Sequence, residues 1–130
     1  MMLLDTHALL WAFGDDDRLS LRARQAIMRD GDLCVSVASL WEMAIKASLP
    51  REERRLALDR TIPEFEALCE AHGVRVLPIT SEDCERTRAL PHIHEDPFDR
   101  MIVAQALVRN MPIVTKDENI QKYEEVTTIW

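Results

Sequence analysis

The stretch MLLDTHALLWAF (Met2–Phe13) shows the pattern on which the fold depends. It begins with an apolar run typical of a buried strand, and Asp5 follows that run directly. The residues from Thr6 to Phe13 have the composition of a helix, and Gly14 comes where such a helix would end. This segment therefore predicts a strand, a carboxylate at its carboxyl end and a helix that leads away from it.

The same order of apolar run and helical pattern recurs along the chain. Further strands are predicted at Leu33–Val37, Val74–Leu77, Ile113–Thr115 and Val126–Ile129. Helices are predicted at Ser20–Asp30, Ser39–Ser48, Thr61–His72, Ser81–Leu90, Phe98–Arg109 and Asn119–Tyr123, with a helical arm within Arg51–Asp59. Apolar strands that alternate with helices are typical of a parallel sheet covered on both faces. We therefore expect an α/β fold with one domain over residues 1–130 and a parallel sheet of about five strands flanked by helices.

Two sequence patterns predict where helices begin. Thr61 with Glu64 fits a capping box, in which two side chains satisfy the first free amides of a helix. Asp96 followed by Pro97 fits an N-cap with a proline in the first turn. We expect both pairs to mark helix starts.

Composition limits the classes of protein to which the chain can belong. Its net charge of −7 argues against binding nucleic acid through a general basic surface. No apolar run approaches the roughly 18 residues of a membrane span, and Asp5 and His7 interrupt the N-terminal segment where a signal peptide would be apolar. We expect no membrane contact and a cytoplasmic protein, with Cys34, Cys69 and Cys84 reduced because they include no Cys-x-x-Cys pair.

Acidic residues follow two of the predicted strands. Ligands of parallel sheets bind at the carboxyl ends of the strands, and Asp5 and Asp117 come at such ends. Asp5 is also suited to cap the helix that follows it, and Asp117 lies in a Lys-Asp-Glu-Asn run that is typical of a solvated turn. Neither residue alone indicates a site.

Two further acids lie on helices that should be largely buried. Glu42 belongs to an apolar helix on which Ser39, Glu42 and Lys46 form one narrow polar stripe, which suits either a cleft or a solvent-exposed ion pair. Asp99 shares a helix face with apolar residues that should point into the core, so its carboxylate is costly unless it is compensated. Asp96 is better explained as the N-cap of that helix than as a ligand.

Four acids from four elements would converge at one end of such a sheet. Their mutual repulsion in a partly desolvated cleft would raise their pKa values or require cations. The donors are almost all oxygen atoms, which are the ligands that Mg²⁺ and Mn²⁺ prefer. The pattern therefore favours a carboxylate-held Mg²⁺ or Mn²⁺ site.

Five segments resemble, in order, those of the PIN-domain family, and in particular the VapC-type ribonuclease toxins of bacterial type II toxin–antitoxin systems. They are LLDTHALLWA, SVASLWEMAIKASL, LPIT, DPFDRMIVAQAL and IVTKD, and their spacing accounts for nearly the whole chain. The chain departs from the family pattern at KASLPREERR, where many relatives have a turn with a glycine. The resemblance implies that the site acids are Asp5, Glu42, Asp99 and Asp117, with Asp96, Thr6, Ser39 and Thr115 as accessory residues.

The resemblance also implies an activity and partners. It implies a Mg²⁺- or Mn²⁺-dependent endoribonuclease that forms a homodimer and is held inactive by an antitoxin protein. Substrates in this group are often structured RNAs. In that case Asp5 and Asp99 would be the principal metal contacts, and Glu42 would bind metal or position the attacking water. Asp117 would act through a water or a second ion.

RNA requires some local positive charge on an acidic protein. The segment from residue 46 to residue 60 has an excess of basic side chains, and its RNA-binding candidates are Lys46, Arg51, Arg54 and Arg55. A solvated helix with internal charge pairs explains the same segment equally well.

Three other interpretations remain open. His92 and His94 are spaced as in zinc or manganese hydrolases of another class, although no second histidine cluster completes such a site. A phosphorylation-receiver domain also has acids after its first strand, but the phosphoacceptor aspartate is absent here. A PIN-like domain that only binds a partner would not need four acids.

An antitoxin helix would fit a groove lined by Trp41, Met43 and the Leu56–Ile62 region, although such residues are more often core.

Overall fold

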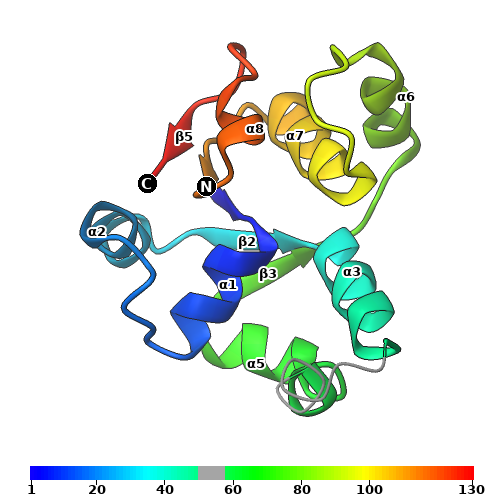
Figure 1. The fold of residues 1–130 in the computed structure, drawn as a ribbon. Helices are drawn as coiled ribbons and strands as arrows, with labels where there is room; N and C mark the ends of the chain where they lie inside the picture. The colour runs from blue at the N-terminus through cyan, green and yellow to red at the C-terminus, as the bar shows by residue number, and fades with distance from the viewer. Residues whose placement is uncertain (50–57) are drawn as a thin grey trace.

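The computed structural model describes residues 1–49 and 58–130. Within these ranges a sheet of five parallel strands forms the centre of the molecule, in the order β3-β2-β1-β4-β5 (Figure 1). Every neighbouring pair is parallel, which confirms the predicted α/β architecture. The strands are β1 (Met2–Leu4), β2 (Leu33–Ser36), β3 (Val74–Leu77), β4 (Ile113–Val114) and β5 (Thr128–Ile129).

Alternate residues of each central strand point to opposite faces of the sheet and form two cores. Leu4, Val35 and Val114 belong to one hydrophobic cluster, together with residues of α1 (Thr6–Phe13), α2 (Leu21–Asp30), α3 (Val37–Ala47) and α5 (Phe65–Ala71). Leu3, Cys34 and Ile113 belong to the other, with residues of α7 (Pro97–Arg109) and α8 (Glu118–Gln121). Figure 1 accordingly shows α1 and α5 on one side of the strands and α7 and α8 on the other, with α6 (Ser81–Ala89) beside α7.

The strand register aligns the carboxyl ends of the two strands that carry acids. Leu4 pairs with Val114, and the Asp5 amide donates a hydrogen bond of 3.2 Å to the Val114 carbonyl. The residues that follow these two strands, Asp5 and Thr115, therefore lie side by side. This edge of the sheet is where the sequence predicts a site.

The capping predictions have different outcomes. Asp96 is the N-cap of α7, since its carboxylate accepts hydrogen bonds from the amides of Phe98 at 2.8 Å and Asp99 at 3.2 Å. The capping box at Thr61 and Glu64 is wrong, because α5 begins at Phe65 and Glu64 makes no capping bond with its side chain. Thr61 is itself helical and lies in a turn of helix that ends shortly before α5. Its backbone therefore lacks the extended conformation that an N-cap requires.

Several element boundaries also differ from the prediction. The strand predicted at Leu33–Val37 ends at Ser36, whose hydroxyl accepts a hydrogen bond from the Ala38 amide and starts α3 directly. The predicted arm at Arg51–Asp59 lies mostly outside the described residues.

Within the described ranges, none of the helices has the length and apolar character that crossing a bilayer requires.

Candidate active site

A cavity of about 380 Å³ opens at the carboxyl end of the sheet. The loop after β1, α3, the start of α7 and the loop after β4 all contribute to its lining. The four acids that the sequence singles out, Asp5, Glu42, Asp99 and Asp117, all line it, although up to 112 positions separate them in the chain. The other lining residues are Thr6, His7, Trp11, Lys46, Asp96 and Lys116.

Asp5 has two roles in the local structure. One carboxylate oxygen accepts a hydrogen bond of 2.8 Å from the Ala8 amide and so caps α1, as the sequence suggested. The other oxygen accepts a hydrogen bond from the hydroxyl of Thr115. Burial raises the pKa of Asp5 above its usual value, and these two hydrogen bonds oppose that rise. The cap explains why the carboxylate lies here, but not why it borders a cavity with three other acids.

Asp99 lies in the first turn of α7 and lines the cavity. Burial raises its pKa to about 8, and repulsion from Asp96, Glu42, Asp117 and Asp5 adds to this rise. Ile102, Val103 and Ala106, which the sequence predicts on the same face of the helix, are buried as expected. Without a cation, Asp99 therefore holds a proton at neutral pH.

Glu42 forms the ion pair with Lys46 that its sequence pattern allowed, but in the cavity and not on a solvent-exposed face. It is buried at the cavity, with 6% exposure, and its carboxylate also lies 3.3 Å from the Lys46 ammonium one helical turn later. Ser39, on the same stripe, is fully buried and accepts a hydrogen bond of 2.9 Å from the Thr6 hydroxyl. That bond joins α1 to α3 and so relates the positions of Asp5 and Glu42.

Asp117 is linked to Asp5 through Thr115. The Thr115 hydroxyl accepts a hydrogen bond of 3.0 Å from the Asp117 amide and donates one to the Asp5 carboxylate. Asp117 also caps α8, since its carboxylate accepts a hydrogen bond of 2.9 Å from the Ile120 amide. Thr115 thus connects two of the four acids.

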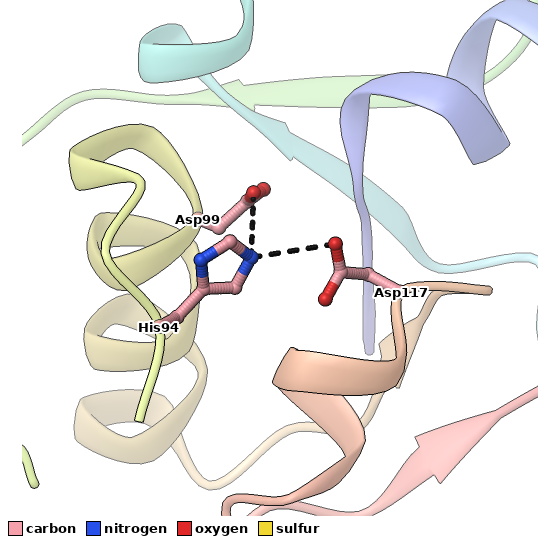
Figure 2. Close-up of side chains that lie close together, drawn as sticks. All are labelled: His94, Asp99 and Asp117. Atoms are coloured by element: carbon pink, nitrogen blue, oxygen red, sulfur yellow. Dashed lines mark hydrogen bonds and ion pairs between the residues drawn. The ribbon is translucent and has the colours of Figure 1, made fainter. Parts of the chain in front are cut away.

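His94 also contacts the cluster, although the pattern of acids did not predict it there. Its Nε2 atom lies 3.0 Å from an Asp99 oxygen and 3.3 Å from an Asp117 oxygen (Figure 2). His92, the other member of the pair weighed as a zinc motif, is exposed. One feature of the sequence does indicate this position. His94 comes two residues before the N-cap Asp96, and a capping turn folds the residues that precede it over the start of the helix.

The donor set fits a hard divalent cation. The carboxylates of Asp99 and Asp117 lie close enough together to share an ion, and a ring nitrogen of His94 lies within 4.8 Å of an oxygen of each. The remaining donors around the cavity are carboxylates, the ligands that Mg²⁺ and Mn²⁺ prefer. Burial and the neighbouring carboxylates both raise the pKa of Asp99, and the positive charge of a bound cation would oppose that rise.

Cation binding is expected to release a proton from Asp99. Below about pH 8 the Asp99 carboxyl is protonated, so a cation must displace that proton, and affinity should rise with pH until it levels off above 8. Titration calorimetry with Mn²⁺ between pH 6 and 9, in buffers of different ionisation enthalpy, measures both the affinity and the proton release. A flat affinity with no proton release would contradict this prediction.

The remaining predicted residues are only partly described. Lys46 lines the cavity, whereas Arg51, Arg54 and Arg55 lie outside the described residues. The predicted partner groove is wrong for Met43, which is buried in the core. Trp41 is 61% exposed and packs edge-on against Phe98.

An acid-lined cavity at the carboxyl end of a parallel sheet defines an α/β protein with a candidate metal centre. The model of the PIN domain family matches residues 2–126, and the chain belongs to that family. It is 34% identical over 133 residues to Ribonuclease VapC22 of Mycobacterium tuberculosis (strain ATCC 25618 / H37Rv). That alignment covers 99% of this chain and 98% of the relative.

Solved structures of similar fold include toxin–antitoxin complexes. VapBC2 from Rickettsia felis, bound to a DNA fragment from its promoter, matches with a TM-score of 0.69 and 10% identity over 98% of this chain and 96% of that one. A toxin–antitoxin complex from Klebsiella pneumoniae matches with a TM-score of 0.66 and 21% identity, over 98% and 97%. At these identities the similarity shows the fold. Membership of the PIN domain family excludes the receiver-domain interpretation.

Proposed function

We propose that this protein is a metal-dependent endoribonuclease and the toxin of a type II toxin–antitoxin pair. The convergence of Asp5, Glu42, Asp99 and Asp117 on one cavity is the observation that carries the proposal. The similarity to a ribonuclease over nearly the full length of both chains supports the activity. The toxin–antitoxin assemblies among the structures of similar fold support the biological role.

The acids would hold Mg²⁺ or Mn²⁺ at the carboxyl end of the sheet. Asp5 and Asp99 are the principal candidates for metal contact, with Asp117 contributing directly or through a water. The bound ion would lower the pKa of a water molecule and offset negative charge on the leaving oxygen. Glu42, buried beside Lys46, pairs with it through one carboxylate oxygen, and we assign the carboxylate to orienting the attacking water.

Basic residues at the cavity supply local positive charge for RNA phosphates on a protein that is acidic overall. Lys46 and Lys116 both line the cavity, so each can attract a phosphate beside the acids. We include Arg51, Arg54 and Arg55 in the RNA-binding surface because of their charge and their place in the sequence after Lys46.

The proposal includes a cognate antitoxin and a homodimer. Three large apolar side chains are exposed on one side of α3 and just beyond it, namely Trp41, Ile45 and Leu49. Trp41 and Ile45 are four residues apart on α3 and so share one face of the helix, and Leu49 follows soon after the helix ends. We assign these exposed apolar side chains to contact with another protein.

Incubation of the purified protein with total RNA tests the activity. Cleavage at defined positions is expected with Mg²⁺ or Mn²⁺ and is expected to stop in EDTA, with cut ends mapped by sequencing. The variant Asp5→Asn, purified in parallel, reveals contaminating nucleases, because asparagine can still cap α1 but supplies no charged oxygen. Cleavage that the Asp5→Asn and wild-type preparations share measures the contaminating background. Absence of any metal-dependent wild-type cleavage above that background would contradict the proposal.

A further inference from the structure

The loop that carries His94 is fixed by hydrogen bonds outside the acidic cluster. The His94 amide donates a hydrogen bond of 3.1 Å to the hydroxyl of Tyr123, and that hydroxyl donates one of 3.2 Å to the Pro91 carbonyl. Tyr123 is buried, and the Arg100 guanidinium donates a further bond of 3.0 Å to the same Pro91 carbonyl. An anchored backbone therefore holds the imidazole of His94 against the carboxylates of Asp99 and Asp117.

The hydrogen bonds of the ring determine which nitrogen carries its proton. The Asp96 amide donates a hydrogen bond of 3.1 Å to Nδ1 of His94. A backbone amide can only donate, so Nδ1 must present a lone pair, and the proton of the neutral ring then lies on Nε2. Nε2 faces two acceptors, the oxygens of Asp99 at 3.0 Å and Asp117 at 3.3 Å (Figure 2).

We propose that His94 is a positioning residue that holds the Asp99 and Asp117 carboxylates together through its Nε2–H and does not itself bind the cation. This inference rests on the proposed metal-dependent function. The two carboxylates come from different elements, α7 and the turn before α8, and they repel each other once a cation has displaced the proton of Asp99 and both are charged. A neutral donor between them offsets that repulsion and leaves the other oxygen of Asp99 available to a cation, while the other oxygen of Asp117 caps α8.

Direct binding of a cation by His94 would require a different tautomer. Nε2 could bind a metal only through a lone pair, and the proton of the neutral ring would then move to Nδ1. Nδ1–H would point at the Asp96 N–H, and the hydrogen bond between them would be lost. Asp96 cannot easily move away, because its carboxylate caps the helix on which Asp99 lies.

Nitrogen NMR of the wild-type protein tests the tautomer without any substitution. Two-bond ¹H–¹⁵N spectra of protein labelled at histidine distinguish a protonated Nε2 from a protonated Nδ1. We expect the Nε2–H tautomer in EDTA and also at saturating Mg²⁺. Transfer of the proton to Nδ1 on addition of Mg²⁺ would show that His94 is a ligand and would overturn the inference.

Three variants test the positioning role by calorimetry with Mn²⁺ in the absence of RNA. His94→Ala is expected to weaken affinity by about 10- to 100-fold, the usual effect of removing a residue that orients metal ligands. His94→Gln, whose amide can donate at a similar reach, is expected to restore most of that loss. His92→Ala, in the same loop but exposed, is the matched control and should bind as wild type does.

Each outcome decides the inference separately from the proposed function. Unchanged affinity in His94→Ala, or a loss in His94→Gln as large as in His94→Ala, would overturn the positioning role. Thermal unfolding in EDTA establishes that the variants are folded. Because neither measurement includes RNA, an absence of RNA cleavage would count against the proposed function and would leave this test unaffected.

Discussion

The variant Asp99→Asn is expected to cut RNA at least about a thousandfold more slowly than wild type and yet to be more stable when metal is absent. The loss of cleavage follows from removing an ionisable oxygen that lines the acidic cavity. Asparagine has nearly the same shape, so it preserves the packing at the start of α7. The opposite changes in activity and stability distinguish a functional acid from a structural one.

The gain in stability follows from the sign of the pKa shift. The pKa of Asp99 rises from its ordinary value of 3.8 to about 8 in the folded protein. The folded state therefore binds a proton more tightly than the unfolded state does, and this contribution is complete below pH 4 and is lost as pH rises through 8. Asparagine carries no such charge, so the advantage of the variant should reach about 1 kcal/mol or more near pH 8.

Urea unfolding in EDTA at pH 6 and pH 8.5, together with RNA cleavage assays in Mn²⁺, measures both effects. Asp17→Asn is the matched control, because Asp17 is exposed and does not line the cavity. Equal stability of Asp99→Asn and wild type at both pH values would show that Asp99 is not strained by its neighbours. Undiminished cleavage by Asp99→Asn would exclude it from catalysis.

The variant Arg109→Met is expected to destabilise the protein by about 3 kcal/mol. Asp83 of α6 is completely buried, and the Arg109 guanidinium of α7 bonds both of its oxygens, at 2.7 and 3.2 Å. Although burial raises the pKa of Asp83, hydrogen bonds from Arg109, from the Thr80 amide and from Gln105 lower it below its usual value. Removal of Arg109 would leave a buried carboxylate without its cation.

The matched control for this variant is Arg88→Met. Arg88 is paired with Glu85 on the surface of α6, where both side chains are largely exposed, and such pairs contribute little. Urea unfolding of both variants at pH 7 measures the difference. The stability that the Asp83–Arg109 pair contributes should fall as the pH drops below 4, because the folded-state pKa of Asp83 is lowered. Equal effects of the two substitutions would show that the buried pair is not a significant contributor.

The sheet and the cluster of acids were predictable because they depend on short-range patterns. Apolar runs followed by helical periodicity predict parallel strands, and parallel strands present their carboxyl ends at one edge. Asp99 was recognisable because Ile102, Val103 and Ala106 show which face of its helix is buried, and all three are buried in the structure. These features need no knowledge of distant contacts.

The features that were missed depend on contacts between distant residues. His94 lies in a loop without periodicity, and its position depends on Tyr123, which is 29 residues away in the chain. Thr61 and Glu64 have the composition of a capping box, but the chain before Thr61 is already helical. Local composition is identical in both conformations, so only the packing of the whole domain distinguishes them.

Several acids at the cavity have a structural role, helix capping, that does not depend on any reaction. Asp5, Asp96 and Asp117 each accept backbone amides at the start of a helix, in α1, α7 and α8. Loss of the carboxylate through substitution by alanine would therefore shorten or loosen a helix, whereas asparagine, serine and threonine still cap. Homologues that have lost catalytic activity are therefore expected to retain a capping residue at these positions. A search for inactive homologues should look for asparagine or serine there and not for arbitrary replacements.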